Sequence, residues 1–377
     1  MFDITARRDT SAREELALIA THIAIHSDIP VDARGLLRES APPPRWTDIG
    51  RTIGPRNFIY ARCCAVDFEE PKLPESSGQN IDVLTIGSIH FDQHLLVSAL
   101  PRSGETVIAH EVTQGLGGKG ANQAVAAARA GARSEMVGFV GDDRTAADVL
   151  RRLNALGVGT GGVIRVRRTD SGAATVTRDV EGANQIVVSP GASAKGEISD
   201  NALAEVIGRA RVVVLQGEIP AAITRRAAVI SAARGVRTVI NLAPVVDLGE
   251  ELGVADPLIL NEIEARQLLG ARDGAVDDIE LARRLGDRAR SVVVTLGERG
   301  AVFSSPDGTR HIPAPAPVRV VDTTGAGDAF VGALAARLAL GVDLEGAVRF
   351  AVAAATRTVE SAGAAESYPH FEEVVIP

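Results

Sequence analysis

The chain has 377 residues, of which 45% are hydrophobic and 23% are charged. This is the composition of an ordinary globular protein, and the length is enough for one large α/β domain with additional segments. The formal net charge of −8 argues against general binding to nucleic acids or membrane surfaces. Glycine is abundant, with 38 residues, and aromatic residues make up only 3%, which suits an α/β enzyme with many tight turns.

The cysteine content and the first residues bear on the compartment. Cys63 and Cys64 are adjacent and are the only cysteines, which excludes a disulfide framework and favours a reducing compartment. Because they have no partners at metal-ligand spacing, we expect inert thiols. The opening MFDITARRDTSAREE lacks the apolar core of a signal peptide, and no run approaches the roughly 18 apolar residues of a membrane span. We therefore expect a cytoplasmic protein.

Residues 1–80 differ in texture from the rest of the chain. The segment SAREELALIATHIAIH is compatible with a short amphipathic helix, but prolines and polar residues interrupt the candidate elements after it. We interpret residues 1–80 as a weakly structured extension or a small helical module, which ends in a linker at 71–80. The main domain is expected at 81–377.

From residue 81, short β-branched runs alternate with alanine-rich helical runs. Strands are predicted at 81–88, 134–141, 211–217, 237–244, 257–261 and 291–297. Helices are predicted at 122–130, 143–156, 221–234, 262–269, 277–289, 328–340 and 344–360. Apolar strands that alternate with helices indicate a three-layer, doubly wound, mostly parallel α/β sheet covered on both faces. Ligands of such sheets bind beyond the carboxyl ends of the strands.

Two segments break this alternation. Residues 162–189 read as three strands joined by turns, and residues 104–114 form another strand-like segment. We expect both in a small antiparallel sheet that projects from the main one. Because such a sheet beside a ligand site is a natural lid and a natural dimer surface, we expect a homodimer through it.

The glycine-rich stretch GLGGKG at 115–120 matches the pattern G-x-G-x-x-G of dinucleotide sites. The segment before it is too polar to be a buried strand, and the first predicted strand, 81–88, lacks the motif. The stretch is not a phosphate-binding Walker loop either, because Lys119 is followed by Gly120 instead of Ser or Thr. A nicotinamide-dependent oxidoreductase is therefore kept only as an alternative.

The stretch VVDTTGAGDAF at 320–330 is the sharpest candidate site. Gly325, Ala326 and Gly327 precede Asp328 at the start of a predicted helix. Small residues let an anion approach the unpaired N–H groups of a helix N-terminus. Asp328 either favours the helix dipole or acts as a general base, which takes a proton from a hydroxyl while the amides hold a transferring phosphoryl group.

Polar residues also follow the other predicted strands. Asp92, Asn122 and Glu218 suit a ligand rich in hydroxyl groups, the pair Asn261 and Glu264 could hold Mg²⁺ through waters, and Thr295 with Gly297 opens a loop to a nucleotide. Each of these could be a turn or a cap if taken alone. Five polar loops at one edge of a sheet indicate a site.

Two stretches carry a resemblance to a known family. GGKGANQAVAAARAGA with VGFVGDD, and DTTGAGDAFVGALAARLALG, resemble the two signature regions of the ribokinase-like (phosphofructokinase-B type) carbohydrate kinases. The likeness covers about 81–370 and is closest to the ribokinase members. It implies ATP-dependent phosphorylation of the primary hydroxyl of a sugar, first of all D-ribose to ribose 5-phosphate, with Mg²⁺ accompanying ATP and K⁺ as a monovalent activator.

The resemblance also implies roles for individual residues. Asp328 would be the catalytic base, with the anion hole formed by Gly325, Ala326 and Gly327. The implied sugar site comprises His90, Asp92, Gly118, Lys119, Asn122, Glu218 and Asp328. The implied nucleotide contacts are Asn261, Thr295, Gly297 and Gly327. Glu264 would lie near Mg²⁺ through water, and the K⁺ ligands would be Asp322, Thr324 and Ser367.

Three positions depart from the family pattern. His90 stands where Asn or Met is common, GAS at 191–193 replaces GAN, and Val352 stands where a polar residue often meets the adenine. These departures leave the sugar open, so another sugar or a nucleoside is an alternative substrate. A non-catalytic sugar-binding regulator is an alternative of another class, although Asp328 argues against it because a binder needs no base.

Overall fold

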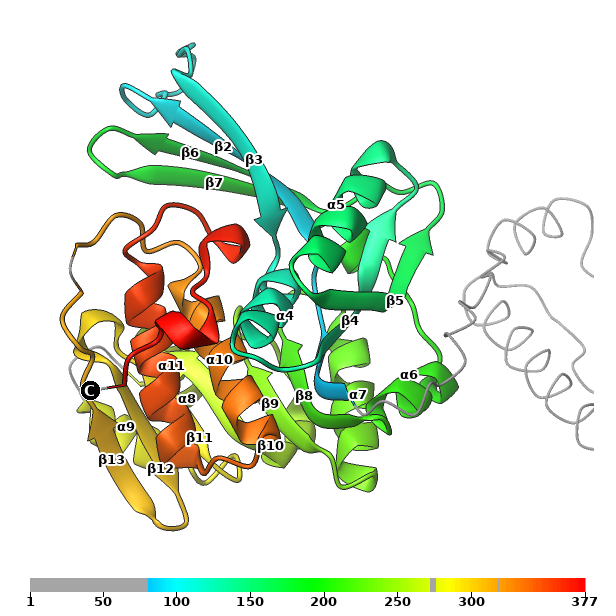
Figure 1. Ribbon diagram of the computed structural model, residues 1–377, viewed down its shortest axis with the longest axis vertical. Helices are drawn as coiled ribbons and strands as arrows, with labels where there is room; N and C mark the ends of the chain where they lie inside the picture. Colours follow the sequence, from blue (N-terminus) through cyan, green and yellow to red (C-terminus); the bar gives the residue numbers. More distant parts are fainter. Residues whose placement is uncertain (1–80, 272–275, 318, 377) are drawn as a thin grey trace, which may run out of the picture. The chain divides into compact units, whose positions relative to one another are not determined.

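The computed structural model describes residues 81–271, 276–317 and 319–376, so the interpretations of residues 1–80 lie outside the described residues. A nine-stranded sheet forms the centre, in the order β13-β12-β11-β10-β9-β8-β1-β4-β5 (Figure 1). Its strands are β1 (Ile81–Ile86), β4 (Ser134–Gly141), β5 (Val158–Val166), β8 (Ala210–Gln216), β9 (Arg237–Asn241), β10 (Ala255–Asn261), β11 (Val292–Thr295), β12 (Ala301–Ser305) and β13 (Gly308–Ile312). Neighbours pair in parallel from β11 to β5, and β12 and β13 are antiparallel additions.

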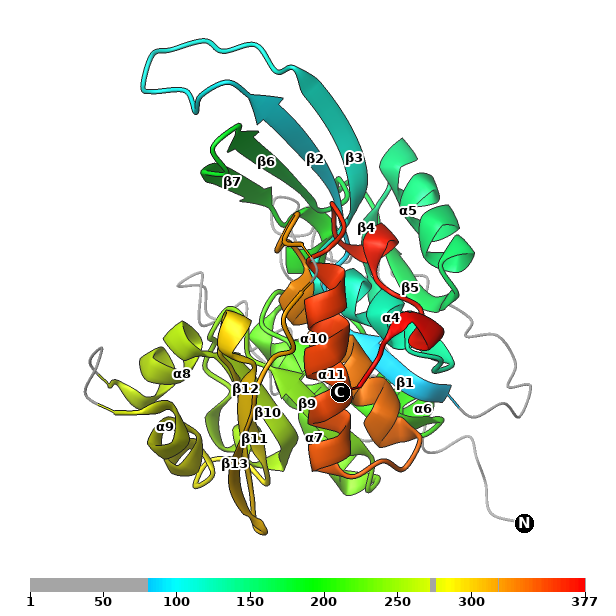
Figure 2. The same ribbon diagram turned by 60° about the vertical axis from the view of Figure 1, so that its left-hand side comes forward.

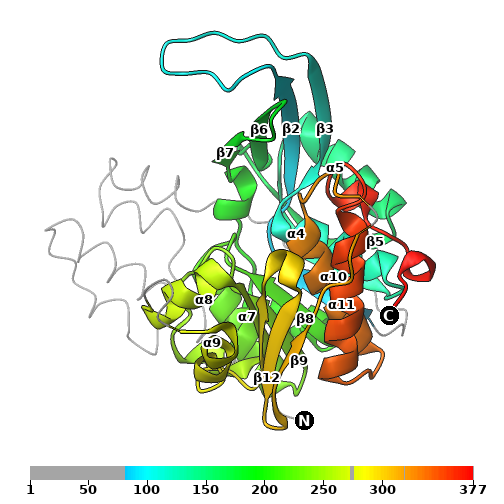
Figure 3. The ribbon, with the colours of Figure 1, turned by 90° about the vertical axis from the view of Figure 1, so that its left-hand side faces the viewer.

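Helices cover both faces of this sheet. One face carries α4 (Lys119–Arg129), α5 (Arg144–Ala155), α10 (Ala326–Ala339) and α11 (Leu344–Thr358), and the other carries α6 (Asp200–Ile207), α7 (Ala221–Ala233), α8 (Glu262–Leu269) and α9 (Asp278–Leu285) (Figure 3). Along β8, Val212 and Val214 pack in the core with α10 and α11, whereas Val213 and Leu215 pack with α6 and α7. The alternation confirms the predicted three-layer fold. No helix among the described residues is long and apolar enough to cross a membrane.

A smaller sheet projects beyond the carboxyl ends of the central strands (Figure 2). Its strands are β2 (His90–Val97), β3 (Glu111–Gly117), β6 (Ala173–Asp179) and β7 (Asn184–Ser189), in the order β3-β2-β6-β7. β2 pairs antiparallel with β3, as β6 does with β7, while β2 and β6 run parallel. We call this four-stranded sheet the lid.

The lid strands differ from their predicted ranges. Residues 104–110 form no strand, and β3 begins only at Glu111. The residues 162–166, predicted in the lid, instead belong to β5, which pairs with β4 in the central sheet. β2 was missed because its sequence HFDQHLLV alternates polar and apolar residues only weakly. The glycine-rich stretch 115–120 therefore begins within lid strand β3 and ends in the first turn of α4, so it does not follow a central strand. This removes the structural context that a dinucleotide site requires.

The path of the chain through the central sheet reverses between β1 and β8. From β1 the chain first adds β4 and β5 on one side, and later adds β8 to β11 on the other. Doubly wound sheets bind their ligands beyond the carboxyl ends of the strands at such a reversal. The ends of β1 and β8 therefore mark where a site is expected.

The helices α4 and α10 approach each other closely above this point. A Cβ atom on Gly332 of α10 would lie 2.4 Å from the carbonyl oxygen of Gln123 and 2.5 Å from Cβ of Ala126, both in α4. Real Cβ contacts are longer, so this helix pairing requires glycine at position 332. The close approach brings the N-terminal turn of α10 against the N-terminal turn of α4.

Candidate functional site

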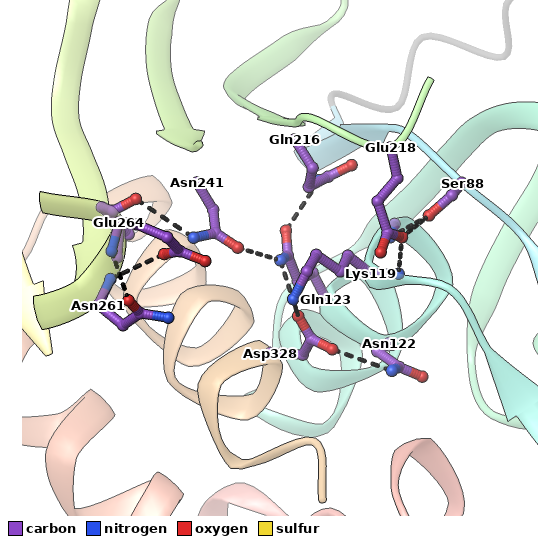
Figure 4. Close-up of polar contacts among 12 residues, drawn as sticks. Ser88, Lys119, Asn122, Gln123, Gln216, Glu218, Asn241, Asn261, Glu264 and Asp328 are labelled. Atoms are coloured by element: carbon purple, nitrogen blue, oxygen red, sulfur yellow. Dashed lines mark hydrogen bonds and ion pairs between the residues drawn. The ribbon is translucent and has the colours of Figure 1, made fainter. Parts of the chain in front are cut away.

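Asp328 lies in the first turn of α10 and is only 8% exposed. Nδ2 of Asn122 donates to Oδ2 of Asp328 at 3.0 Å, and Nε2 of Gln123 donates to Oδ1 at 3.0 Å (Figure 4). Nζ of Lys119 lies 3.9 Å from Oδ1. The three donors stand at positions i, i+3 and i+4 of α4, which share one helix face. A buried carboxylate is thereby held by two amides and an ammonium group.

Lys119 also joins the carboxylate to the end of β8. Its backbone N–H donates to Oε2 of Glu218 at 2.9 Å, and the hydroxyl of Ser88, which follows β1, donates to the same oxygen at 2.5 Å. The charge of Asp328 raises the pKa of Lys119 above its ordinary value against the effect of burial, and Glu218 and Glu264 add to the rise. Lys119 therefore keeps its positive charge at neutral pH, at the reversal point of the sheet.

The N-terminus of α10 is shaped by its glycines. Gly325 is the N-cap in the left-handed region, with φ of 76°, and a Cβ there would lie 2.6 Å from the hydroxyl of Tyr368. Beyond the adjoining residues of its own helix, no atom of the described residues lies within 4 Å of the place where a side chain on Gly327 would start, so the backbone is open to an approaching group. The N–H of Ala326 donates to the carbonyl of Thr323 at 3.3 Å, which leaves Gly327 as the least hindered of the predicted anion-hole residues.

His90 and Asp92 lie on strand β2 of the lid, not in a loop after the first strand. Oδ1 of Asp92 accepts from the N–H of Ala174 at 2.9 Å; burial raises the pKa of Asp92, and His90 and the Ala174 hydrogen bond oppose the rise. His90 is 5% exposed, and its Nε2 is buried with no hydrogen-bond partner among the described residues. A Cβ on Gly172 would lie 2.3 Å from its ring. The imidazole is thus enclosed but chemically unsatisfied.

Gly118 and Asn122, two further residues of the predicted sugar site, lie at the start of α4. Gly118 is the N-cap of α4 with φ of 83°, and a Cβ there would lie 3.0 Å from the carbonyl oxygen of Ser88. Asn122 is 8% exposed, and its Nδ2 donates to Asp328. Its Oδ1 points away from that bond, is buried, and has no partner among the described residues. An unpaired acceptor next to a carboxylate suits a hydroxyl group, which can donate to either of them.

The predicted nucleotide residues lie farther along the sheet edge. Asn261 ends β10 and forms a capping box with Glu264: the N–H of Glu264 donates to Oδ1 of Asn261 at 2.8 Å, and the N–H of Asn261 donates to Oε2 of Glu264 at 2.9 Å. Thr295 donates to the carbonyl of Leu260 at 3.4 Å, and Gly297 starts a short turn with φ of 58°.

Two of the departures from the family pattern are buried. Val352 is 4% exposed within the core formed with α10 and α11. Ser193 is fully buried, and its hydroxyl lies 3.2 Å from both the N–H and the carbonyl oxygen of Ile89. Both side chains therefore have a structural role in this chain.

The residues predicted to bind a monovalent cation gather before α10. Oδ1 of Asp322 accepts from the N–H and the hydroxyl of Thr324, and Oδ2 accepts from the N–H of Gly363. Ser367 directs its hydroxyl to the carbonyls of residues 363 and 364. Burial alone would raise the pKa of Asp322, but these hydrogen bonds and the charge of Arg178, 3.8 Å away, lower it below its ordinary value.

Sequence reasoning missed a set of buried amides behind Asp328. Gln123, Gln216 and Asn241 are at most 7% exposed and are hydrogen-bonded to one another. Two of them end central strands, where a polar residue after a run of valines and isoleucines usually indicates the start of a loop. The available signal was the amide at the end of an apolar strand. Because buried polar groups are hydrogen-bonded, such a Gln or Asn, if buried, is expected to have a polar partner nearby.

Comparisons with known proteins agree with this arrangement. Residues 80–370 match the model of the pfkB family carbohydrate kinases. The chain is 36% identical to a ribokinase of Mus musculus over 81% of this chain and 97% of that protein, and 35% identical to a deoxyribokinase of Salmonella typhi over 78% and 97%. The structure of Arabidopsis thaliana ribokinase with ribose and ATP matches with a TM-score of 0.72 and 30% identity, covering 78% of this chain and 98% of that one. By its sequence and its fold, the chain belongs to the pfkB carbohydrate kinase family.

Proposed function

We propose that the chain transfers the γ-phosphoryl group of ATP to the primary hydroxyl of D-ribose, which yields ribose 5-phosphate and ADP. One observation carries this proposal: the buried carboxylate of Asp328 stands at the N-terminus of α10, beside the open backbone at Gly327. A relative that this chain matches over nearly that protein's whole length is a ribokinase, and a similar structure holds both ribose and ATP.

The chemistry is determined by the groups around Asp328. The carboxylate accepts one N–H at each oxygen and keeps further lone pairs, so it can take the proton of the sugar hydroxyl. The hydroxyl oxygen then bonds to the γ-phosphorus while the bond from that phosphorus to the ADP oxygen breaks. The N–H groups at the start of α10 and the charge of Lys119 stabilise the negative charge of the transferring group.

Glu264 is the residue that we propose to lie near Mg²⁺, which neutralises phosphate charge when it is bound with ATP. One oxygen of this carboxylate is used by the capping box, and the second has no such bond to the cap. Because Mg²⁺ retains waters and takes few protein ligands, a single carboxylate that acts through water fits the residues present. Among the described residues, no cluster of three or more acidic, His or Cys side chains offers a dedicated metal site.

Replacing Asp328 by asparagine tests the role of the base. Asn is nearly isosteric and also suits a helix N-terminus, so the fold should be retained. Loss of a general base typically costs roughly 10²–10⁴-fold, and we expect this loss in kcat, with little change in KM for ribose or ATP. Asp343→Asn, at the N-cap of α11, is the matched control. An Asp328→Asn enzyme within a few-fold of the wild-type rate would refute the mechanism.

The sugar is proposed to be read in part by His90. Ribokinase and deoxyribokinase relatives are almost equally similar to this chain, so overall identity does not decide between ribose and its 2-deoxy analogue. Nε2 of His90 is buried and has no hydrogen-bond partner in the part of the chain that the structure describes, so it can pair with a sugar hydroxyl. A site built to pair a hydroxyl discriminates against an analogue that lacks it.

We expect His90→Asn to change the ratio of kcat/KM for ribose to that for 2-deoxyribose by roughly 2- to 10-fold, the equivalent of about one net hydrogen bond. The measurement is a coupled ADP-release assay over a panel of sugars and nucleosides. His110→Asn is the control, because His110 is exposed and bonded to Ser98 at 2.6 Å. If the ratio stays the same in the His90 variant, the imidazole only packs against its neighbours. If a nucleoside or another sugar is the best substrate of the panel, the proposal that D-ribose is the substrate is wrong.

We further propose that K⁺ binds beside Asp322, Thr324 and Ser367. The oxygen atoms gathered there suit a hard monovalent cation. Burial raises the pKa of the Asp322 carboxyl, but its hydrogen bonds and the charge of Arg178 outweigh burial and lower that pKa, so the carboxylate is charged. The nearby charge of Arg178 already balances part of the carboxylate charge, so the cation is expected to bind weakly.

Replacing K⁺ by a large organic cation at constant ionic strength should lower the rate by a few-fold. Asp322→Asn should remove the difference between the two salts, because the charged ligand is lost. Equal wild-type rates in both salts would exclude the cation site.

A second copy of the chain is proposed to cover the lid. β7 is an edge strand whose six residues are all exposed, including Ile186, Val187 and Val188 at 54–71%. Apolar edge strands invite pairing with another chain. We expect sedimentation of the full chain to give a dimer and Val187→Lys to weaken it. A wild-type monomer at micromolar concentration would contradict this.

A further inference from the structure

A chain of buried amides extends from Asp328 to the central sheet (Figure 4). Nε2 of Gln123 donates both to Oδ1 of Asp328 at 3.0 Å and to Oδ1 of Asn241 at 2.9 Å. Nδ2 of Asn241 donates to the backbone carbonyl of Ile259 at 3.2 Å, and Nε2 of Gln216 donates to Oε1 of Gln123 at 2.8 Å. The amide of Gln123 is therefore bonded on both its nitrogen and its oxygen.

The direction of this chain is set by the carbonyl of Ile259. A backbone carbonyl only accepts, so Asn241 must present its nitrogen to Ile259 and its oxygen to Gln123. Gln123 must then present its nitrogen, and the same nitrogen faces Asp328. Strand β10 thus ensures, through two side chains, that Asp328 meets a donor and never the oxygen of a flipped amide.

This arrangement leaves two buried acceptors unpaired. Oε1 of Gln216 and Oδ1 of Asn122 have no hydrogen-bond partner among the described residues, and Gln216 is fully buried. Gln216 also requires a glycine at position 87, because a Cβ there would lie 1.8 Å from Oε1. An unsatisfied buried acceptor destabilises the fold. The unpaired acceptors accompany an arrangement in which Asn122 and Gln123 direct their amide nitrogens to Asp328 and Gln216 directs its nitrogen to Gln123.

We propose that Gln123 is a positioning residue for the phosphoryl transfer. It fixes the plane of the Asp328 carboxylate, so that a free lone pair faces the sugar hydroxyl. This inference rests on the proposed role of Asp328 as the base. Gln123 itself is fully buried and acts through Asp328.

Few other ionisable groups among the described residues act on this carboxylate. Lys119 of α4 faces Oδ1 of Asp328 at 3.9 Å. The charge of Asp328 adds to the burial that raises the pKa of Tyr368 in the C-terminal segment, and Glu218 and Glu264 act on Lys119. Lys119 would remain in place in a Gln123 variant, so any change in the rate of that variant is attributed to the lost amide donor.

Two substitutions of Gln123 test the proposal. Gln123→Met removes the donor but keeps a long side chain, and Gln123→Glu changes one atom and places a second carboxylate beside the first. We expect kcat to fall at least about 10-fold in both, with KM for sugar and ATP changed less than about 3-fold. The fall in kcat should be larger for Gln123→Glu than for Gln123→Met, because the first change removes a donor and also places a like charge beside the base.

The matched control is Thr224→Val, which removes a hydrogen bond from another fully buried side chain, to the backbone carbonyl of Gln216. It should keep the wild-type kcat and KM even if the protein becomes less stable. A thermal melt of each variant separates loss of folding from loss of rate. If Gln123→Met does not fold, the one-atom change Gln123→Glu carries the test.

A double variant separates this inference from the proposed function. If Gln123 acts only through the carboxylate, Gln123→Met should reduce single-turnover rates less than about 2-fold in an Asp328→Asn background. An active Asp328→Asn enzyme would overturn the base itself, and this inference with it. A slow Asp328→Asn enzyme, together with Gln123 variants that keep the wild-type kcat, would overturn this inference alone.

Discussion

Burial of one carboxylate sets the requirements for the rest of the site. An ionised side chain taken out of water is strongly destabilising unless it is paired and hydrogen-bonded. At Asp328 the compensation comes from two amide donors, from an ammonium group 3.9 Å away and from the N-terminus of its own helix. None of these donors belongs to α10 except the helix end itself. The site therefore depends on how α4 is placed against α10.

Small side chains allow α4 and α10 to pack this closely. The facing residues of the two helices are mostly alanines, and at Gly332 even a methyl group would meet the backbone of α4. Regular helices that meet at such short range define the positions of their first turns closely, because neither helix can shift without a clash. A functional group held by packed elements is positioned more accurately than one on a loop. The proposed base is held in this manner, whereas Gly327, which is proposed to face the phosphate, is open.

Prediction from the sequence succeeded where the signal is local. Valine-rich strands and alanine-rich helices carry their own periodicity, and α8 and β4 were predicted at their observed bounds, whereas β2, whose sequence HFDQHLLV alternates only weakly, was missed. Asp328 could be proposed from its glycine-rich neighbours. The proposed role of Gln123 could not, because it arises from Asn241 and Gln216, which are more than ninety residues away. Partners so distant in sequence can be identified only when the order of the strands in the sheet is known.

The lid and the start of α10 are linked through Asp322. Arg178 on the lid strand β6 lies 3.8 Å from Oδ2 of Asp322, while Oδ1 of the same carboxylate holds the backbone N–H and hydroxyl of Thr324. Thr324 directly precedes the N-cap of α10. On the neighbouring strand β2, the lid carries Asp92, whose carboxylate is bonded across to Ala174 of β6. One pair of strands thus bears both a proposed sugar contact and a charge that acts on the loop before the proposed anion hole. The position of the lid therefore affects the electrostatic field at Asp322 and in the turn that precedes the proposed anion hole.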